Sequence, residues 1–436
     1  MDLLPSEIIS NIVHHVGEGS LPPLSVLCRR WQPIVEAKIY RELHISYQRP
    51  GKRRQRRYPK SIRDPSDKKL ANNLTPTRLS YVRHLHIVIA RYGRDSPISS
   101  ADIVRQLFDL LTRVPHNQEP LLNLHFRLIT GYSDPDSLFC DTVEYPPDGL
   151  PELPMVRSFT LNNDAMKTEP SPHALLYMAS KMPRLRGLSV ITWDVGSIDQ
   201  RVELARSLAD LPASIHSFFL HFFPDDNSEG LLVTENGEDI LTRELRRFSQ
   251  REGLKEFLFN GYAELSIFWP PDSATSEPRH WPTLESFEIL LPRPQHLASL
   301  YATESPDVAQ DGNDSDIESS DDAQDANDSD IESSDDAQDA NDSDRIDVNK
   351  EIMRASFRAL AKCSACMPEA EENYVYFGDT WRIRFAYCTM FPEDPCVTVT
   401  GKLDFELDEE TLDEWRKTAE VHNLNFQMCV EEWPEQ

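Results

Sequence analysis

The feature that most constrains the fold is a repeated alternation of two kinds of segment along the chain. Short runs with alternating apolar residues predict strands, and stretches with apolar residues at three-to-four spacing predict helices. The expected strands cover residues 82–90, 122–129, 156–161, 185–192, 215–222, 254–259 and 284–291. The expected helices cover residues 100–114, 171–181, 201–211, 241–252 and 350–362. Because strands and helices alternate, the fold class is mixed α/β.

Repetition of one strand and one helix per unit predicts an irregular, leucine-rich-repeat-like solenoid. The regular Asn or Cys ladder of such repeats is missing, and a plain α/β domain with a single sheet is the alternative. Residues 178–190 and 360–376 echo each other, since each contains a Met-Pro pair after a helical stretch. Near the end of the chain, a last strand is expected at 397–405 and a helix at 408–421.

One segment holds most of the excess negative charge. The net charge is -28, and between Glu304 and Asp347 eighteen acidic residues stand against the single Arg345. Hydrophobic residues are 39% of the chain, below the usual ~45–50%, so part of it cannot pack. The acidic segment contains a near-identical repeat and no aromatic residue, so we expect a disordered insertion at 303–348.

Four serines of the acidic repeat have an acidic residue three positions later. This pattern is preferred by acidophilic kinases of the casein-kinase type, and phosphorylation would add further negative charge. The phosphorylation candidates are Ser315, Ser319, Ser329 and Ser333. The alternative is an unmodified spacer.

A basic run lies at residues 49–69, with ten basic and two acidic residues. It is interpreted as a nuclear import signal, as a site for an acidic partner, or as a solvated linker over residues 46–78. The nuclear-import candidates are Lys52, Arg53, Arg54, Arg56 and Arg57.

Targeting features favour the nucleus, the cytoplasm or both. The seven scattered cysteines do not form a disulfide framework, which indicates a reducing compartment. The start lacks the basic end and apolar run of a signal peptide. No run approaches the ~18 apolar residues of a membrane span, so a membrane is not an expected partner.

The first forty-five residues predict three short helices. Apolar residues at 8, 9, 12, 13 and 16 mark one helix face, which begins near Pro5 and ends at Gly17. Pro22 can start a second helix and Pro33 a third. A unit this small cannot bury all of its large apolar residues. The remaining apolar surface implies a partner, either the body of the chain or another protein.

These residues carry a family resemblance. LPSEIISNIVHHV, then LPPLSVLCRRW and a trailing IYRELHIS, together resemble an F-box, the module through which such proteins dock on the Skp-type adaptor of a cullin-RING ubiquitin ligase. The sequence departs from the family pattern at Gly19–Pro23, before the second helix. Residues 281–287 resemble the C-terminal region common among fungal F-box proteins. The alternative is a helical cap on a larger domain.

The resemblance implies a set of adaptor-binding residues, some of which must instead form the small core of the module. The candidates are Leu4, Pro5, Ile8, Ile9, Ile12, Leu24, Leu27, Cys28 and Trp31.

The sequence gives little indication of a catalytic site or a metal site. The chain contains no G-x-S-x-G, P-loop or H-E-x-x-H run. Cys363 and Cys366 form a lone C-x-x-C, which is more typical of buried thiols than of zinc ligands. His84 and His86 share one strand face but have no third ligand within the pattern. We therefore expect no enzyme activity, no catalytic residue, no metal and no cofactor.

The predicted organisation is an F-box at 1–45, a basic linker at 46–78, a body at 79–302, the acidic insertion at 303–348 and the rest of the body at 349–436. This organisation predicts the substrate-recognition subunit of an SCF-type ligase, which presents an unknown protein target. The alternative is a nuclear interaction protein whose acidic loop binds basic partners such as histones. Nucleic acid is not an expected partner. A hydrolase with an unrecognised site is a third hypothesis.

Overall fold

The computed structural model describes somewhat more than half of the chain. The described residues are 4–26, 28–48, 75–91, 100–113, 122–130, 149–163, 172–194, 198–224, 234–235, 238–270, 280–291, 351, 353–370, 372–377, 381–385, 397–401, 407–423, 426 and 428–431. The nuclear-import candidates, the acidic insertion with its four serines, and Leu27 lie outside them. No helix in the described ranges has both the length and the apolar character needed to cross a membrane.

Twelve strands form one sheet, ordered β1-β2-β3-β4-β5-β6-β9-β10-β11-β12-β13-β14. From β1 to β11 all neighbours pair in parallel, and the β11–β12 and β12–β13 pairs are antiparallel. The strands are β1 Glu42–Gln48, β2 His84–Arg91, β3 Leu122–Thr130, β4 Val156–Asn163, β5 Gly187–Asp194, β6 Ser217–Pro224, β9 Glu256–Asn260, β10 Ser286–Leu291, β11 Glu372–Phe377, β12 Trp381–Phe385, β13 Val397–Gly401 and β14 Met428–Glu431. A separate hairpin pairs β7 Thr234–Glu235 with β8 Glu238–Asp239.

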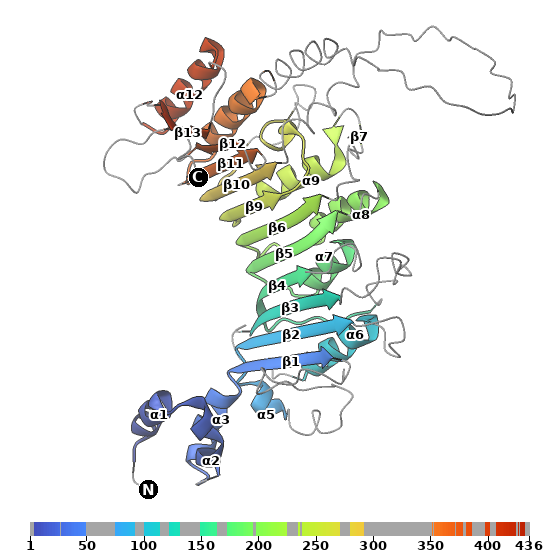
Figure 1. Cartoon of the computed structure of the whole chain (residues 1–436), viewed down its shortest axis with the longest axis vertical. Coiled ribbons are helices and arrows are strands. Elements are labelled where there is room, and N and C mark those ends of the chain that lie inside the picture. Colours follow the sequence, from blue (N-terminus) through green and yellow to red (C-terminus); the bar gives the residue numbers. More distant parts are fainter. Residues whose placement is uncertain are drawn as a thin grey trace, which may run out of the picture.

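Helices lie in the connections between many of the successive parallel strands, as is usual for crossovers between parallel strands. Figure 1 shows the strands lying side by side in one long sheet, with α6, α7, α8 and α9 along one side of it. These helices are α6 Ser100–Leu111, α7 Pro172–Ser180, α8 Ile198–Ala209 and α9 Ile240–Ser249, and residues 353–365 form a further helix between β10 and β11. The shorter elements are α5 Pro76–Leu79 and η3 Leu265–Ile267, and α12 Glu409–Val421 lies between β13 and β14.

The core consists of columns of buried side chains that run across the sheet. Because strand side chains alternate between faces, in-register pairing places every second residue on the same side. The rings of Phe218, Phe257 and Phe287 stack with centroids 5.6 Å apart in both steps. One column contains Leu43, Leu85, Leu124, Phe159, Leu188, Phe218, Phe257 and Phe287; another contains Ile45, Ile87, Phe126, Leu161, Val190, Leu220, Phe259, Ile289 and Val375. The residues between them lie on the opposite face and are partly exposed.

The two echoing segments occupy equivalent places in the fold. Met182 and Met367 are both fully buried at the end of a helix. Each carbonyl accepts a hydrogen bond from the amide three residues later, from Leu185 at 2.9 Å and from Ala370 at 3.2 Å. A parallel strand, β5 or β11, follows each turn. The repeat seen in the sequence is therefore a repeat of the turn that ends a helix and begins a strand.

The mixed α/β class is confirmed, and all seven strands expected between residues 82 and 291 form within two residues of their expected ends. The expectation that residues 397–405 hold the last strand is wrong. β14 follows α12 and pairs in parallel with β13. This strand has only four residues, too few to show a period, and its place depends on β13.

The start of the sheet also differs from expectation. β1 spans the expected boundary between residues 45 and 46 and pairs with β2 along its whole length. α5 lies within the region expected to be linker. The segment before the basic run thus contributes the first strand of the body, whose Leu43 and Ile45 are buried.

Two buried arginines tie α8 and α9 to the turns around them. Arg246 has no exposed side-chain surface and pairs with Glu238. Arg201 Nη2 lies 3.4 Å from Asp239 Oδ2 and donates to the Tyr262 carbonyl at 3.1 Å. Asp239 also caps α9, because its Oδ2 accepts from the Thr242 amide at 2.8 Å. The buried charges are therefore compensated by partners from several elements.

Replacing Arg246 should strongly destabilise the body. Arg246→Ala leaves Glu238 buried without its cation, which costs about 3–5 kcal/mol. The matched control is Arg247→Ala, whose side chain is 47% exposed and pairs with Glu244 one turn away, a contact worth about 0.3–0.5 kcal/mol. Urea unfolding followed by tryptophan fluorescence measures both. Equal midpoints for the two variants would contradict the role of the buried pair.

Candidate functional site

The N-terminal module has its own core, separate from that of the body. It contains α1 Ser6–His15, η1 Glu18–Ser20, α2 Leu21–Ser25 and α3 Trp31–Ile39. The third helix begins at Trp31, two residues before the expected Pro33. The buried residues of this small core are Ile9, Val13, Leu21, Trp31 and Val35. The module is thus a compact unit that presents a surface of its own (Figure 1).

The candidate adaptor-binding residues divide between this core and the surface. Ile9 and Trp31 are buried, at 0% and 5% exposure. Ile8 and Ile12 remain exposed, at 46% and 38%. Of the other candidates within the described residues, Leu4, Leu24 and Cys28 are partly buried against the core and Pro5 is exposed.

The surface of α1 has two different sides. Ile8 and Ile12 are four residues apart and therefore lie on one side of the helix. A groove beside α3 is lined by Ser6, Glu7, Ser10, Asn11, His14 and Ile34. Except for Ile34, this groove is polar. The exposed apolar surface of α1 is therefore concentrated on the Ile8–Ile12 side.

Lys38 of α3 holds the end of α1 in place. Its Nζ donates to the carbonyls of Val13 at 2.7 Å, His14 at 2.8 Å and Val16 at 3.0 Å. A lysine at a helix C-terminus satisfies carbonyls that have no partner within the helix and interacts favourably with the helix dipole. This contact fixes α1, and with it Ile8 and Ile12, relative to α3. The periodicity of the sequence does not predict this contact between Lys38 and the end of α1.

An ion pair joins the module to the body. Arg78 Nη2 of α5 lies 2.8 Å from Glu36 Oε1 of α3, and the Arg78 guanidinium lies 5.2 Å from the centroid of the Tyr40 ring. Tyr40 also packs against the body core. Burial raises the pKa of Glu36, but hydrogen bonds from Arg78 and Gln32 and the charge of Arg78 lower it overall. Glu36 is therefore charged at neutral pH and stabilises the junction.

A column of histidines lies on the open face of the sheet, opposite the helices. His44, His86 and His125 occupy matching positions on β1, β2 and β3. The His44 and His86 rings stack at 4.5 Å, and the His86 and His125 rings at 4.6 Å. Burial lowers the pKa of both His86 and His125, and the neighbouring imidazoles lower it further. The lowered pKa values favour the neutral form of His86 and His125.

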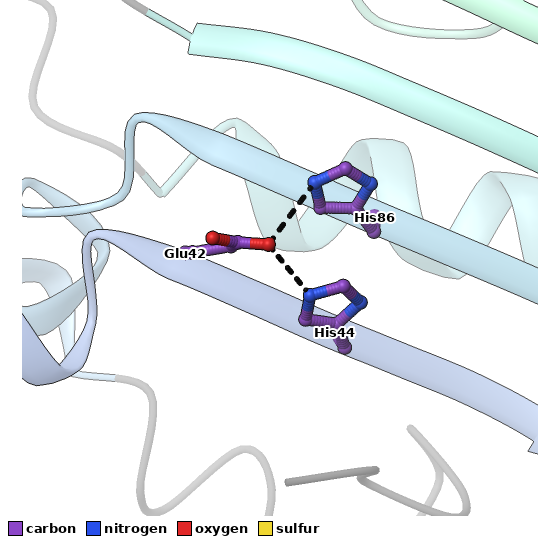
Figure 2. A group of neighbouring side chains, drawn as sticks. All are labelled: Glu42, His44 and His86. Carbon is purple, nitrogen blue, oxygen red and sulfur yellow. Dashed lines mark hydrogen bonds and ion pairs between the residues drawn. The ribbon is translucent and has the colours of Figure 1, made fainter. Parts of the chain in front are cut away.

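A carboxylate lies against two of these rings. Glu42 Oε1 is 2.9 Å from His44 Nε2 and 3.6 Å from His86 Nε2, and Figure 2 shows the carboxylate beside the two rings, with a dashed line to each. The hydrogen bond from His44 lowers the pKa of Glu42, although burial opposes this. One ligand atom from each residue lies within 4.8 Å of the others. The sequence pattern offered no third ligand beside His84 and His86, whereas strand pairing brings Glu42 and His44 of β1 next to His86.

The Cys363–Cys366 pair lies at the end of the helix over residues 353–365. Cys363 is fully buried in the body core, and burial raises its thiol pKa well above its ordinary value. Cys366 is partly buried against the same core. A buried protonated thiol is a poor metal ligand, so the geometry favours the interpretation of structural thiols. Cys388 and Cys396 lie outside the described residues.

No protein-family model matches the chain, and a search of curated proteins finds no match.

The junction between module and body should weaken in acid. A lowered carboxyl pKa in the folded state stabilises the fold at neutral pH, and this stabilisation is lost as the pH falls below about 4.5. Glu36→Gln should therefore lower the urea midpoint at pH 7 and have a smaller effect in acid. The exposed Glu203→Gln on α8 is the control. A pH-independent difference between wild type and Glu36→Gln would contradict the assignment.

Proposed function

We propose that this protein is the substrate-recognition subunit of an SCF-type cullin-RING ubiquitin ligase. In this proposal the N-terminal module is an F-box that docks on a Skp-type adaptor, and the body presents a protein target. The protein acts without a catalytic residue of its own, in the nucleus, the cytoplasm or both. The observation that carries the proposal is a compact helical module with exposed isoleucines at a site where the sequence resembles an F-box.

The exposed pair on α1 supports a protein partner. Ile8 and Ile12 each retain more than a third of their surface. Within the described part of the module Val26, just after α2, is also exposed, and the remaining large apolar side chains are buried or partly buried against the core. Burying one such side chain contributes roughly 1.5–3 kcal/mol when it is complete, so covering both isoleucines is a substantial gain. Pro5 and the partly buried Leu4 lie immediately before the helix. Together they form an apolar surface suited to a docking partner.

The body supports a role in presenting a target. Its strands follow one another in sequence order, with helices on one side and an open face on the other, as expected for a leucine-rich-repeat-like array. The matched central positions of the open face are His44, His86, His125, Thr160, Ser189, Phe219, Leu258 and Glu288. This column changes from imidazoles through hydroxyls to the apolar Phe219 and Leu258, and it ends at the carboxylate of Glu288. A protein target whose binding surface has a polar part and an apolar part would be complementary to this open face.

The link between the two parts fits a scaffold. β1 follows α3 almost directly and pairs with β2, and the Glu36–Arg78 ion pair joins the same two regions. A target bound on the open face would therefore be held at a defined position relative to the adaptor. Ligases of this kind act by proximity, because they raise the local concentration of a target near the charged ubiquitin carrier.

The surface isoleucines should control adaptor binding. Ile8→Asp/Ile12→Asp places two charges in the proposed interface and should weaken adaptor binding by about 30-fold or more, since interface hot spots cost at least about 2 kcal/mol. Ser10→Asp/Asn11→Asp adds the same charges on the polar side of α1 and is the matched control. Calorimetric titration with a purified Skp-type adaptor measures the affinities.

Three further measurements make this test decisive. Circular dichroism confirms that both double variants retain the helices, because neither touches the buried Ile9 or Trp31. Deletion of residues 303–348 should leave adaptor affinity unchanged and should remove any salt-sensitive binding of basic proteins. Failure of the folded wild-type protein to bind the adaptor, or equal binding by the two double variants, would overturn the proposal and favour the charged-partner alternative.

A further inference from the structure

Two neighbouring strands bring metal-binding side chains together at the edge of the sheet. β1 carries Glu42 and His44 two residues apart, and β2 carries His84 and His86 in the matching positions. Residues two apart in a strand point to the same face. All four side chains therefore belong to the open face, on the edge strand and its neighbour. This arrangement arises only when the two strands pair in this register.

The distances suit one metal ion. Tetrahedral zinc bonds of about 2.0–2.1 Å separate the ligand atoms by roughly 3.3 Å. The Glu42–His44 and Glu42–His86 distances of 2.9 and 3.6 Å bracket this value. The rings of His44 and His86 are nearly parallel, at 8°, so each must tilt toward the other to share an ion. Imidazole χ2 angles vary broadly at little cost.

We propose that Glu42, His44 and His86 form a binding site for a divalent transition-metal ion of the zinc class. Two imidazoles and one carboxylate select zinc and its neighbours over Mg²⁺ and Ca²⁺, which prefer sites made of oxygen ligands. The side chains of Glu42, His44 and His86 are 57%, 40% and 31% exposed. The ion can thus enter from solvent, and a fourth position remains open for water or for a side chain of a bound protein.

Neighbouring residues support this site. His125 stacks on the outer side of His86, and the Asn123 amide nitrogen lies 3.3 Å from His84 Nδ1. The stack restricts the orientation of the proposed ligand His86, and the Asn123 contact restricts His84, which lies beside the site and is not one of its ligands. Metal binding requires the lone pair of each Nε2, so each neutral imidazole would carry its proton on Nδ1, and coordination would replace the contacts between Nε2 and Glu42. The ion would connect the edge strand β1 to β2, next to the junction with the N-terminal module.

The test uses the full-length protein stripped of metal and titrated with Co²⁺, with Mg²⁺ in excess to occupy the acidic repeat. We expect one equivalent of Co²⁺ to give visible d–d bands of a four- or five-coordinate ion, without a thiolate charge-transfer band, and Zn²⁺ to displace it. His44→Ala/His86→Ala should weaken this binding by more than about 100-fold. Zn²⁺ should also raise the thermal unfolding midpoint of the wild type and not of this variant.

Two further variants separate ligation from folding. Glu42→Gln keeps the shape of the side chain and removes its charge, so weaker binding by this variant identifies the carboxylate as a ligand. His221→Ala on β6, where His221 lies near Asn260 as His84 lies near Asn123, should bind as the wild type does. Unchanged Co²⁺ binding by the double histidine variant, thiolate bands that disappear in Cys363→Ser/Cys366→Ser, or no binding by the wild type would each overturn the site.

Discussion

The structure depends on in-register pairing of successive parallel strands. Each strand places alternate residues in the same buried columns, so Phe218 meets Phe257, which in turn meets Phe287. A slip of one residue would move these rings to the open face and bring polar side chains into the core. The helices, the turns and the open-face column all follow from this register. The histidine stack is a consequence of the same pairing, since His44, His86 and His125 share one position in the strands.

The second constraint is the way the N-terminal module is attached. α3 leads into β1 through Tyr40, and the first strand of the sheet is thus also the connection to the module. Lys38 fixes α1 on α3 inside the module, and Arg78 fixes α3 on the body. The proposed adaptor surface and the proposed metal site therefore lie at the two ends of one short, well-connected segment of the chain.

Sequence reasoning succeeded where a period was long enough to read. The strands around Leu188 and Leu220 were identified because buried and exposed residues alternate over a full strand. It failed at β1, whose short alternation adjoins a helical pattern, and at β14, which is too short to show a period. In α1 the periodicity found the apolar positions but did not separate the buried Ile9 from the exposed Ile8 and Ile12, since apolar residues cover a wide arc of that helix.

The sequence by itself determined the α/β class, the order of the main strands and helices between residues 82 and 291, and the existence of an N-terminal helical module, because these depend on local periodicity and composition. Only the tertiary structure decided which apolar residues remain exposed and which polar residues meet. Glu42 and His86 are far apart in the chain, and no local pattern joins them. Their contact depends on the register of β1 against β2, which is set by the burial of Leu43 and Ile45 in columns that the whole sheet shares.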